Sequence, residues 1–323
     1  MTTTAEPAVA AVESQSTTPP PPEELRRLAH RRVVPLRHPA RWIAAALVLV
    51  LLANFGQTLF TNPQWEWHKL AKWFFSPAIV TGLRITIIAT LVSAVVSFAA
   101  GIVLAVARLS PNPVLSGLSW FYIWLFRSLP IILVLIFLYH SGSLYPTIGV
   151  GVPFGPQVEL ATFNEIPDIA LGIIGLSLVE TAFSAEIVRA GILSVDQGQH
   201  EAAKALGISR RRQFSRIVLP QALRSIVPSY VNQVVNLIKA SSLLFYVSVL
   251  DLFGVVQNLG STYPGDVIPL LVVATLWYLI LTSLISVVQY YVERFYARGA
   301  FRVLPPTPFQ RVKLALASIG ARR

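Results

Sequence analysis

Three stretches of the chain are apolar over a length that suits a membrane rather than a soluble core. They cover 42–60, 85–107 and 267–292, and the first two carry no charged residue. A helix needs about 20 largely apolar residues to cross the hydrocarbon core of a bilayer, so each stretch predicts a transmembrane helix. The third also has aromatic residues suited to a membrane interface, Trp277, Tyr278, Tyr290 and Tyr291.

Three further stretches, 118–139, 169–188 and 222–250, are apolar but interrupted by polar residues. Polar groups at bilayer depth face a bundle interior or a cavity more often than lipid, so we predict these stretches as spans and as the functional ones. The fold class is then an all-α integral membrane protein with six transmembrane helices. The interrupting residues are Arg127 and Pro130, then Glu180 and Glu186, then Asn232, Gln233, Asn236 and Lys239.

The composition agrees with a membrane protein and excludes several other classes. Of the 323 residues, 54% are hydrophobic and 13% charged, whereas soluble domains carry about 25% charged residues. The net charge of +11 does not indicate nucleic-acid binding, because Lys and Arg stand at the ends of apolar stretches and in connecting loops. The absence of cysteine excludes a disulfide framework, a thiolate metal site and a cysteine nucleophile.

The chain shows no catalytic pattern of its own. It contains no Gly-x-x-x-x-Gly-Lys-Ser/Thr phosphate loop, so any ATP would have to be bound by a partner. Its five histidines have no metal-like spacing. We therefore predict that the chain is not an enzyme and binds no cofactor or metal.

The basic residues predict the orientation. Lys and Arg are frequent before the first span, within 194–220 and after the last span, whereas 141–168 and 251–267 contain none. Because basic loops stay in the cytoplasm, both termini and the loop 194–220 are expected on the cytoplasmic side of the plasma membrane. Lys69 and Lys72 are the exceptions on the outer side.

The remaining segments are tails and connections. The Pro-rich segment 1–41 is predicted as a disordered cytoplasmic tail. Residues 42–80 would form the first transmembrane helix with an outer segment, and 295–323 a basic cytoplasmic tail. The Gly- and Pro-rich stretch 143–168 is expected to be a loop at the outer surface.

The loop 194–220 predicts two short helices that meet at Gly207. Gly207 suits the left-handed conformation that ends a helix. Ser209 is expected to cap the second helix and Pro220 to stop it. The residues alone leave two interpretations open, an amphipathic element on the inner leaflet and a docking element for a partner. The first would be held by Arg210, Arg211 and Arg212.

The same loop resembles the EAA loop of binding-protein-dependent ABC import permeases. The matching pattern is Glu201-Ala202-Ala203, three residues, Gly207, nine residues, and then Ile217-Val218-Leu219-Pro220. The neighbouring sequence, including Phe126-Arg127-Ser128-Leu129-Pro130, is similar to the polar amino-acid branch, whose members carry histidine, glutamate, glutamine, arginine or opines. The resemblance implies a permease domain over 81–294 with the type 1 importer fold.

The resemblance also implies a mechanism and partners. The loop would be a coupling helix seated in a groove of a separate ATPase, with Glu201 in contact, Ala202 and Ala203 permitting close packing, and Gly207 shaping the bend. Ile217, Leu219 and Pro220 complete the coupling motif. Two ABC ATPase subunits, a second permease chain, identical or homologous, and an extracytoplasmic solute-binding protein would assemble with this chain in the lipid bilayer.

Five residues are candidates for the substrate pathway. Glu180 would contact the solute's amino group, or form a structural ion pair with a residue such as Lys239, or stay a buried protonated acid. Arg127 would hold a carboxylate or extend to the inner interface. One helical face carries Asn232, Asn236 and Lys239. This face would either line the pathway or form hydrogen bonds to other helices.

Other classes of transporter remain open at this point. An ion-coupled secondary transporter would use Glu180 and Lys239 as ion or proton relays. A membrane scaffold would present its Pro-rich tail to a partner domain. An ABC permease for an osmolyte or opine would keep the mechanism and change the solute.

Overall fold

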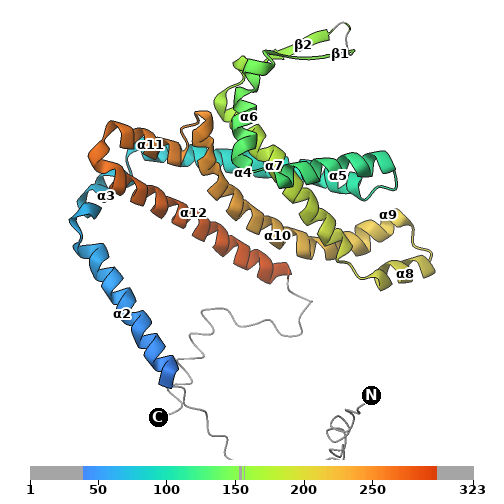
Figure 1. Cartoon of the computed structure of the whole chain (residues 1–323). Coiled ribbons are helices and arrows are strands. Elements are labelled where there is room, and N and C mark those ends of the chain that lie inside the picture. Colours follow the sequence, from blue (N-terminus) through green and yellow to red (C-terminus); the bar gives the residue numbers. More distant parts are fainter. Residues whose placement is uncertain (1–38, 153–154, 156, 297–323) are drawn as a thin grey trace, which may run out of the picture. The chain divides into compact units, whose positions relative to one another are not determined.

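The computed structural model describes residues 39–152, 155 and 157–296 (Figure 1). The predicted tails 1–41 and 295–323 therefore lie almost entirely outside the described residues. The chain divides into two compact units, Met1–Asn62 and Pro63–Arg323. In the first unit, α2 (Pro39–Thr61) is a single apolar helix in the predicted position. Its side chains from Ala40 onward are exposed or half-buried on every side, which is typical of a helix surrounded by lipid.

The second unit is a helical bundle with one small hairpin. Its first half contains η1 (Pro63–Trp65), α3 (Trp67–Phe74), α4 (Pro77–Arg108), α5 (Pro113–Ser128), α6 (Ile131–Leu144), β1 (Thr147–Gly151), β2 (Gln157–Thr162) and η2 (Phe163–Glu165). Its second half contains α7 (Asp168–Leu193), α8 (Gln197–Ala205), α9 (Arg210–Gln213), the π-helical η3 (Phe214–Val218), α10 (Leu219–Ala240), η4 (Ser241–Val247), α11 (Leu252–Thr262), η5 (Pro264–Asp266) and α12 (Val267–Tyr296).

Four helices of the described chain are long and apolar enough to span a membrane, and two bent helix pairs bring the number to six if each counts as one span. Six is the predicted number. The first pair, α5 and α6, bends by 104° at Pro130. A residue before proline is kept out of the helical region, and Leu129 is accordingly extended, with φ −87° and ψ 136°. The second pair bends by 46° before α11.

The centre of the bundle is the contact between α4 and α7. Gly101 of α4 lies so close to α7 that a Cβ atom there would meet Ser184 Cβ at 2.5 Å. Ala105, one turn further along α4, is completely buried. Small residues that allow such close backbone approach are typical of helix pairs in membranes. This pair fixes the position of Glu180, which lies on α7.

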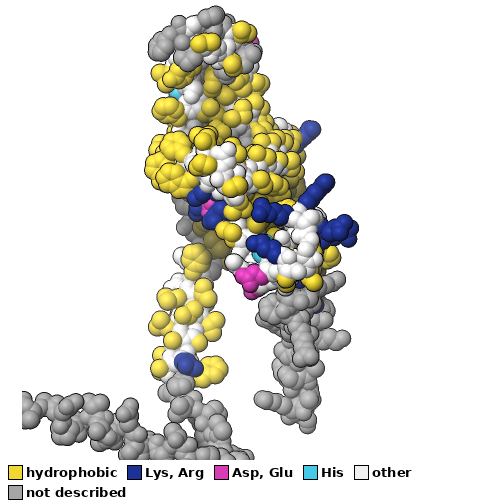
Figure 2. All heavy atoms as spheres, turned by 90° about the vertical axis from the view of Figure 1, so that its right-hand side faces the viewer, with side chains coloured by type: hydrophobic (Ala, Val, Ile, Leu, Met, Phe, Trp, Pro, Cys, Tyr) yellow, Lys and Arg dark blue, Asp and Glu magenta, His cyan; other side chains and the backbone are white. Residues whose placement is uncertain are grey.

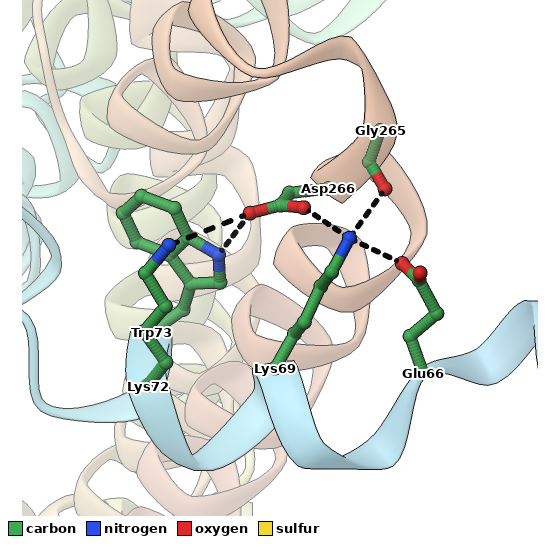
Figure 3. Close-up of polar contacts among 6 residues, drawn as sticks. All are labelled: Glu66, Lys69, Lys72, Trp73, Gly265 and Asp266. Carbon is green, nitrogen blue, oxygen red and sulfur yellow. Dashed lines mark hydrogen bonds and ion pairs between the residues drawn. The ribbon is translucent and has the colours of Figure 1, made fainter.

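A polar cluster joins α3 to η5, directly before α12 (Figure 3). Lys69 Nζ lies 2.6 Å from Asp266 Oδ1 and 2.8 Å from Glu66 Oε2. The Trp73 indole N–H donates to Asp266 Oδ2 at 2.8 Å, and Lys72 Nζ lies 3.9 Å from the same oxygen. The two lysines that break the charge pattern of the sequence are therefore paired with carboxylates.

The stretch 143–168 is more ordered than the predicted loop. Strands β1 and β2 pair antiparallel, with an irregularity in the register between Ile148 and Gly149. The hairpin projects from the end of α6 (Figure 1). Valine and threonine residues favour strands, but glycine and proline within the same stretch masked that signal.

Candidate functional site

The loop between α7 and α10 has the predicted break at Gly207. Asp196 caps α8, since its side chain accepts a hydrogen bond from the Gly198 N–H at 2.7 Å. Gly207 has φ +64°, and the N–H groups of Gly207 and Ile208 donate to the carbonyls of Lys204 and Ala203, both at 3.0 Å. This pair of bonds is the Schellman motif, in which glycine is favoured at the left-handed position.

The second half of the loop corrects two expectations. Ser209 occupies the N-cap position of α9, but its side chain makes no capping hydrogen bond. Pro220 does not stop the helix, because the chain passes through the π-helical turn η3 directly into α10. In that turn the Leu219 N–H bonds the Phe214 carbonyl. Pro220 is then the second residue of α10, directly after the π-helical turn.

A side-chain contact holds the two short helices together. Gln213 Nε2 lies 3.0 Å from His200 Nδ1 and donates to the His200 carbonyl at 3.4 Å. Gln213 is 7% exposed, although an amide side chain is usually found at the surface. Neither residue stood out in the sequence. Only the three-dimensional fold of the loop brings them together across Gly207.

The outward surface of the loop combines small, acidic and apolar side chains. Glu201 and Ala202 are exposed, whereas Ala203 is buried inside the loop. Leu206 is 77% exposed at the end of α8. Among the other motif residues, Gly207 and Pro220 are exposed and Ile217 and Leu219 half-buried. An exposed leucine beside an exposed carboxylate is a surface suited to a protein partner.

Glu180 lies in a buried polar cluster between α7, α4 and α10. It is 4% exposed, and Gln233 of α10 lies close enough to its carboxyl group to interact with it. Its Oε1 atom and the hydroxyls of Ser177 and Ser184 have no hydrogen-bond partner among the described residues. Tyr230 of α10 also reaches this region, donating its hydroxyl proton to the Ala94 carbonyl of α4.

The pathway candidates do not form one site. Glu180 faces Gln233, while Asn232, Asn236 and Lys239 are exposed on another face of α10. The ion pair with Lys239, one of the alternatives for Glu180, is not formed, since none of the ion pairs among the described residues involves Glu180. The periodicity placed Lys239 with the two asparagines but could not tell which face of α10 meets α7.

Arg127 lies in a separate pocket. Its Nη1 atom is 3.9 Å from Glu186 Oε2, and its guanidinium lies 5.7 Å from the centre of the Phe183 ring.

Asp251 is a buried acid that was not among the predicted site residues. It caps α11 by accepting from the Gly254 N–H at 2.9 Å, and Tyr278 donates to it at 3.2 Å. An aspartate before an apolar helix is a recognisable N-cap signal.

Comparisons with known proteins agree on one family. The model of a family described as binding-protein-dependent transport system inner membrane component matches residues 97–298. The chain is 39% identical over 271 residues to the arginine transport system permease protein ArgU of Corynebacterium glutamicum, covering 84% of each. It is 31% identical over 236 residues to the glutamate/aspartate import permease protein GltK of Escherichia coli, covering 72% of this chain and 98% of that protein.

Solved structures agree with this result. A crystal structure of an amino acid ABC transporter with histidines matches 70% of this chain and 97% of its own, with 26% identity and a TM-score of 0.59. An inward-facing structure of the MetNI methionine ABC transporter shares the fold at 20% identity, covering 68% of this chain and 96% of its own, with a TM-score of 0.53. The chain is therefore a multi-pass membrane protein that belongs to the family of binding-protein-dependent transport system inner membrane components, the permeases of ABC importers.

Proposed function

We propose that this chain is the transmembrane permease subunit of an ATP-driven importer for polar amino acids, working by alternating access. The observation that carries the proposal is the loop 194–220, whose exposed Glu201 and Ala202 stand on a helix fixed by Gly207 and Gln213. The loop links the end of α7 directly to the start of α10, and these helices meet again at Glu180 and Gln233. A displacement of the loop would therefore reach the buried polar cluster.

The coupling surface would dock on a separate ATPase. Glu201 would contact that subunit and Ala202 would allow its close approach, while the buried Ala203 keeps the loop compact. Gly207 sets the bend, and Ile217, Leu219 and Pro220 connect the loop to α10. Two ATPase subunits, a second permease chain and an extracytoplasmic solute-binding protein would complete the transporter. The family description, binding-protein-dependent transport, supports the solute-binding protein among these partners.

The orientation follows from charge. Both termini and the loop 194–220 would lie in the cytoplasm, because basic loops are retained there. The two outer lysines do not oppose this orientation, since Lys69 is paired with Asp266 and Glu66. The hairpin β1–β2 would then face the outside.

The solute would be a polar amino acid, as the names of the relatives for arginine and for glutamate or aspartate indicate. Glu180 is our candidate for the contact with its amino group. Buried polar atoms normally have a partner, and the open Glu180 Oε1 beside two open serine hydroxyls offers acceptors to a solute or to water. Asn232, Asn236 and Lys239 would line an exposed part of the pathway.

The test is transport in proteoliposomes by the reconstituted complex of permease and ATPase subunits together with the solute-binding protein, with uptake and ATP hydrolysis measured together. Glu201→Ala should lower the amount of solute moved per ATP while the protein still inserts. Gln199→Ala, at an exposed position of the same helix, is the matched control. Wild-type uptake that needs only an ion gradient, or equal coupling in both variants, would overturn the proposal.

A further inference from the structure

Three arginines from three helices converge on one cavity. Arg108 is the last residue of α4, Arg127 lies at the end of α5, and Arg189 lies in α7. The cavity measures about 540 Å³, and Glu186, Trp120 and Trp124 also line it. Positions so far apart in the sequence form a single basic pocket only because α5 crosses both α4 and α7.

The charges in this pocket do not balance. Arg189 binds Glu186 with two hydrogen bonds, from Nε at 3.0 Å and from Nη2 at 2.8 Å. Arg127 lies 3.9 Å from the same carboxylate, beyond hydrogen-bond distance. Arg108 donates to the neutral Ser116 hydroxyl at 2.8 Å. Glu186 is the one acid among the described residues that line the cavity, so two positive charges remain without a counter-charge.

The surroundings of the pocket are those of a membrane interface. Trp120 and Trp124 stack with their ring centres 6.1 Å apart, and both are about half-exposed, as is Phe121 beside them. Tryptophan is enriched where the hydrocarbon core meets the headgroups, and arginine side chains near helix ends extend to the same interface. On the face drawn in Figure 2, Lys and Arg side chains gather along the lower margin of a mainly hydrophobic surface.

We propose that this pocket binds the phosphate group of an anionic phospholipid in the cytoplasmic leaflet. The guanidinium groups of Arg108 and Arg127 offer paired donors that match phosphate oxygens. The stacked tryptophans would pack against the glycerol and upper acyl region. A lipid bound there would hold the end of α5 against α4 and α7. The choice of leaflet rests on the orientation in the proposed function, while the binding itself does not.

A solute carboxylate is the competing ligand, because it offers the same oxygen chemistry to Arg127. The structure favours the lipid on two grounds. Glu180, the candidate for the solute's amino group, is not among the residues lining this cavity. The half-exposed tryptophans and Phe121 present apolar surface beside the arginines, which a small polar solute would leave uncovered.

The test is native mass spectrometry of the full-length chain in detergent, titrated with phosphatidylglycerol and, separately, with phosphatidylcholine. We expect phosphatidylglycerol to bind at least tenfold more tightly. The double variant Arg108→Gln/Arg127→Gln should lose affinity for phosphatidylglycerol by about fivefold per arginine, or roughly twenty-five-fold together. Arg224→Gln, at an exposed position of α10 outside the pocket, should bind within twofold of the wild type.

Several outcomes would overturn the proposal. They are equal binding of the two lipids by the wild type, unchanged affinity in the double variant, and displacement of the lipid by millimolar inorganic phosphate or free amino acid. If the glutamine variant does not fold, Arg108→Lys/Arg127→Lys is the second variant to measure. It keeps the charge, and its affinity for phosphatidylglycerol should fall a few-fold because lysine lacks the paired donors. Since this measurement needs no ATPase and no transport, its failure would leave the proposed function intact.

Discussion

Gln213 Nε2 lies 3.0 Å from His200 Nδ1, joining α9 to α8 across the turn at Gly207. The contact lies inside the loop, as do the Schellman bonds that end α8. The loop therefore holds its shape through its own residues, before any partner binds. A surface that is already ordered loses less conformational entropy on binding, so it suits repeated engagement during transport.

Removing the Gln213 contact should loosen α8. A net hydrogen bond contributes about 1 kcal/mol, so Gln213→Leu should speed amide exchange in Gln197–Ala205 by about fivefold. His200→Phe should have an equal or smaller effect, since it leaves the longer bond to the His200 carbonyl, and the double variant should exceed Gln213→Leu little, because both changes remove the same bond between the side chains. Hydrogen exchange followed by mass spectrometry measures this, with Gln199→Leu as control. Fully additive effects would show that the two side chains act separately.

Whether a residue can replace Gly207 should depend on its ability to adopt the left-handed backbone conformation and not on the size of its side chain. Its φ of +64° disfavours residues with a Cβ, yet a Cβ there would meet nothing within 4 Å. Gly207→Val should therefore reduce solute transport per ATP strongly, whereas Gly207→Asn should keep most of it, since asparagine tolerates the left-handed region. Gly117→Ala, in open space within a regular helix, is the control. Equal losses in the valine and asparagine variants would contradict the conformational argument.

Glu180→Gln should impair uptake far more than assembly. The variant keeps the shape of the side chain but removes the carboxylate charge, so uptake of an amino acid whose cationic amino group it contacts should fall by about tenfold, in line with one charge-assisted hydrogen bond. Thr181→Val is the neighbouring control, because the Thr181 hydroxyl already donates to the Ser177 carbonyl of its own helix at 2.7 Å. Concentration-dependent uptake separates affinity from rate. Unchanged kinetics for every amino acid tested would remove Glu180 from the pathway.

The cluster at Asp266 should stabilise the folded protein as long as Lys69 is protonated, and the stabilisation should be lost at high pH. Hydrogen bonds from Lys69 to Asp266 and then Glu66 raise the pKa of Lys69 above its ordinary value of 10.5. The stabilisation is therefore complete below pH 10.5 and is lost as the pH rises through the raised pKa. Lys69→Met should melt lower than the wild type near neutral pH, and the difference should shrink at high pH.

Lys72→Met provides the control for this cluster. Lys72 has a side chain that is 63% exposed and lies 3.9 Å from Asp266, so its removal should change the melting temperature little. Melting curves of purified protein between neutral and strongly alkaline pH measure both variants. A difference in melting temperature between Lys69→Met and the wild type that grows with pH would contradict this prediction.

Local signals in the sequence predicted much of this structure. The turn at Gly207 was predicted correctly, because a left-handed conformation depends on one residue and its immediate neighbours. Pro130 interrupted the third span visibly, although the bend of 104° depends on where α5 packs. The prediction that Pro220 ends the helix was wrong, because a π-helical turn continues the helix up to and beyond this residue. No single residue in the sequence indicates such a turn.

Contacts between distant segments were beyond the reach of sequence patterns. Lys239 was matched with Glu180 by chemistry, yet the rotation of α10 turns Gln233 toward α7 instead. The arginines of the basic pocket stand at positions 108, 127 and 189, and only Arg127 was predicted as a site residue. In each case the missing information was the packing of one helix against another.

The absence of cysteine allows the docking claim to be tested with a single reactive residue. Ala202→Cys places a thiol on the exposed face of α8, and Tyr145→Cys places one at the exposed end of α6. A short thiol-reactive cross-linker applied to the assembled transporter should join position 202, and not position 145, to the ATPase subunit. Cross-linking to the ATPase from position 145 but not from position 202 would contradict the account.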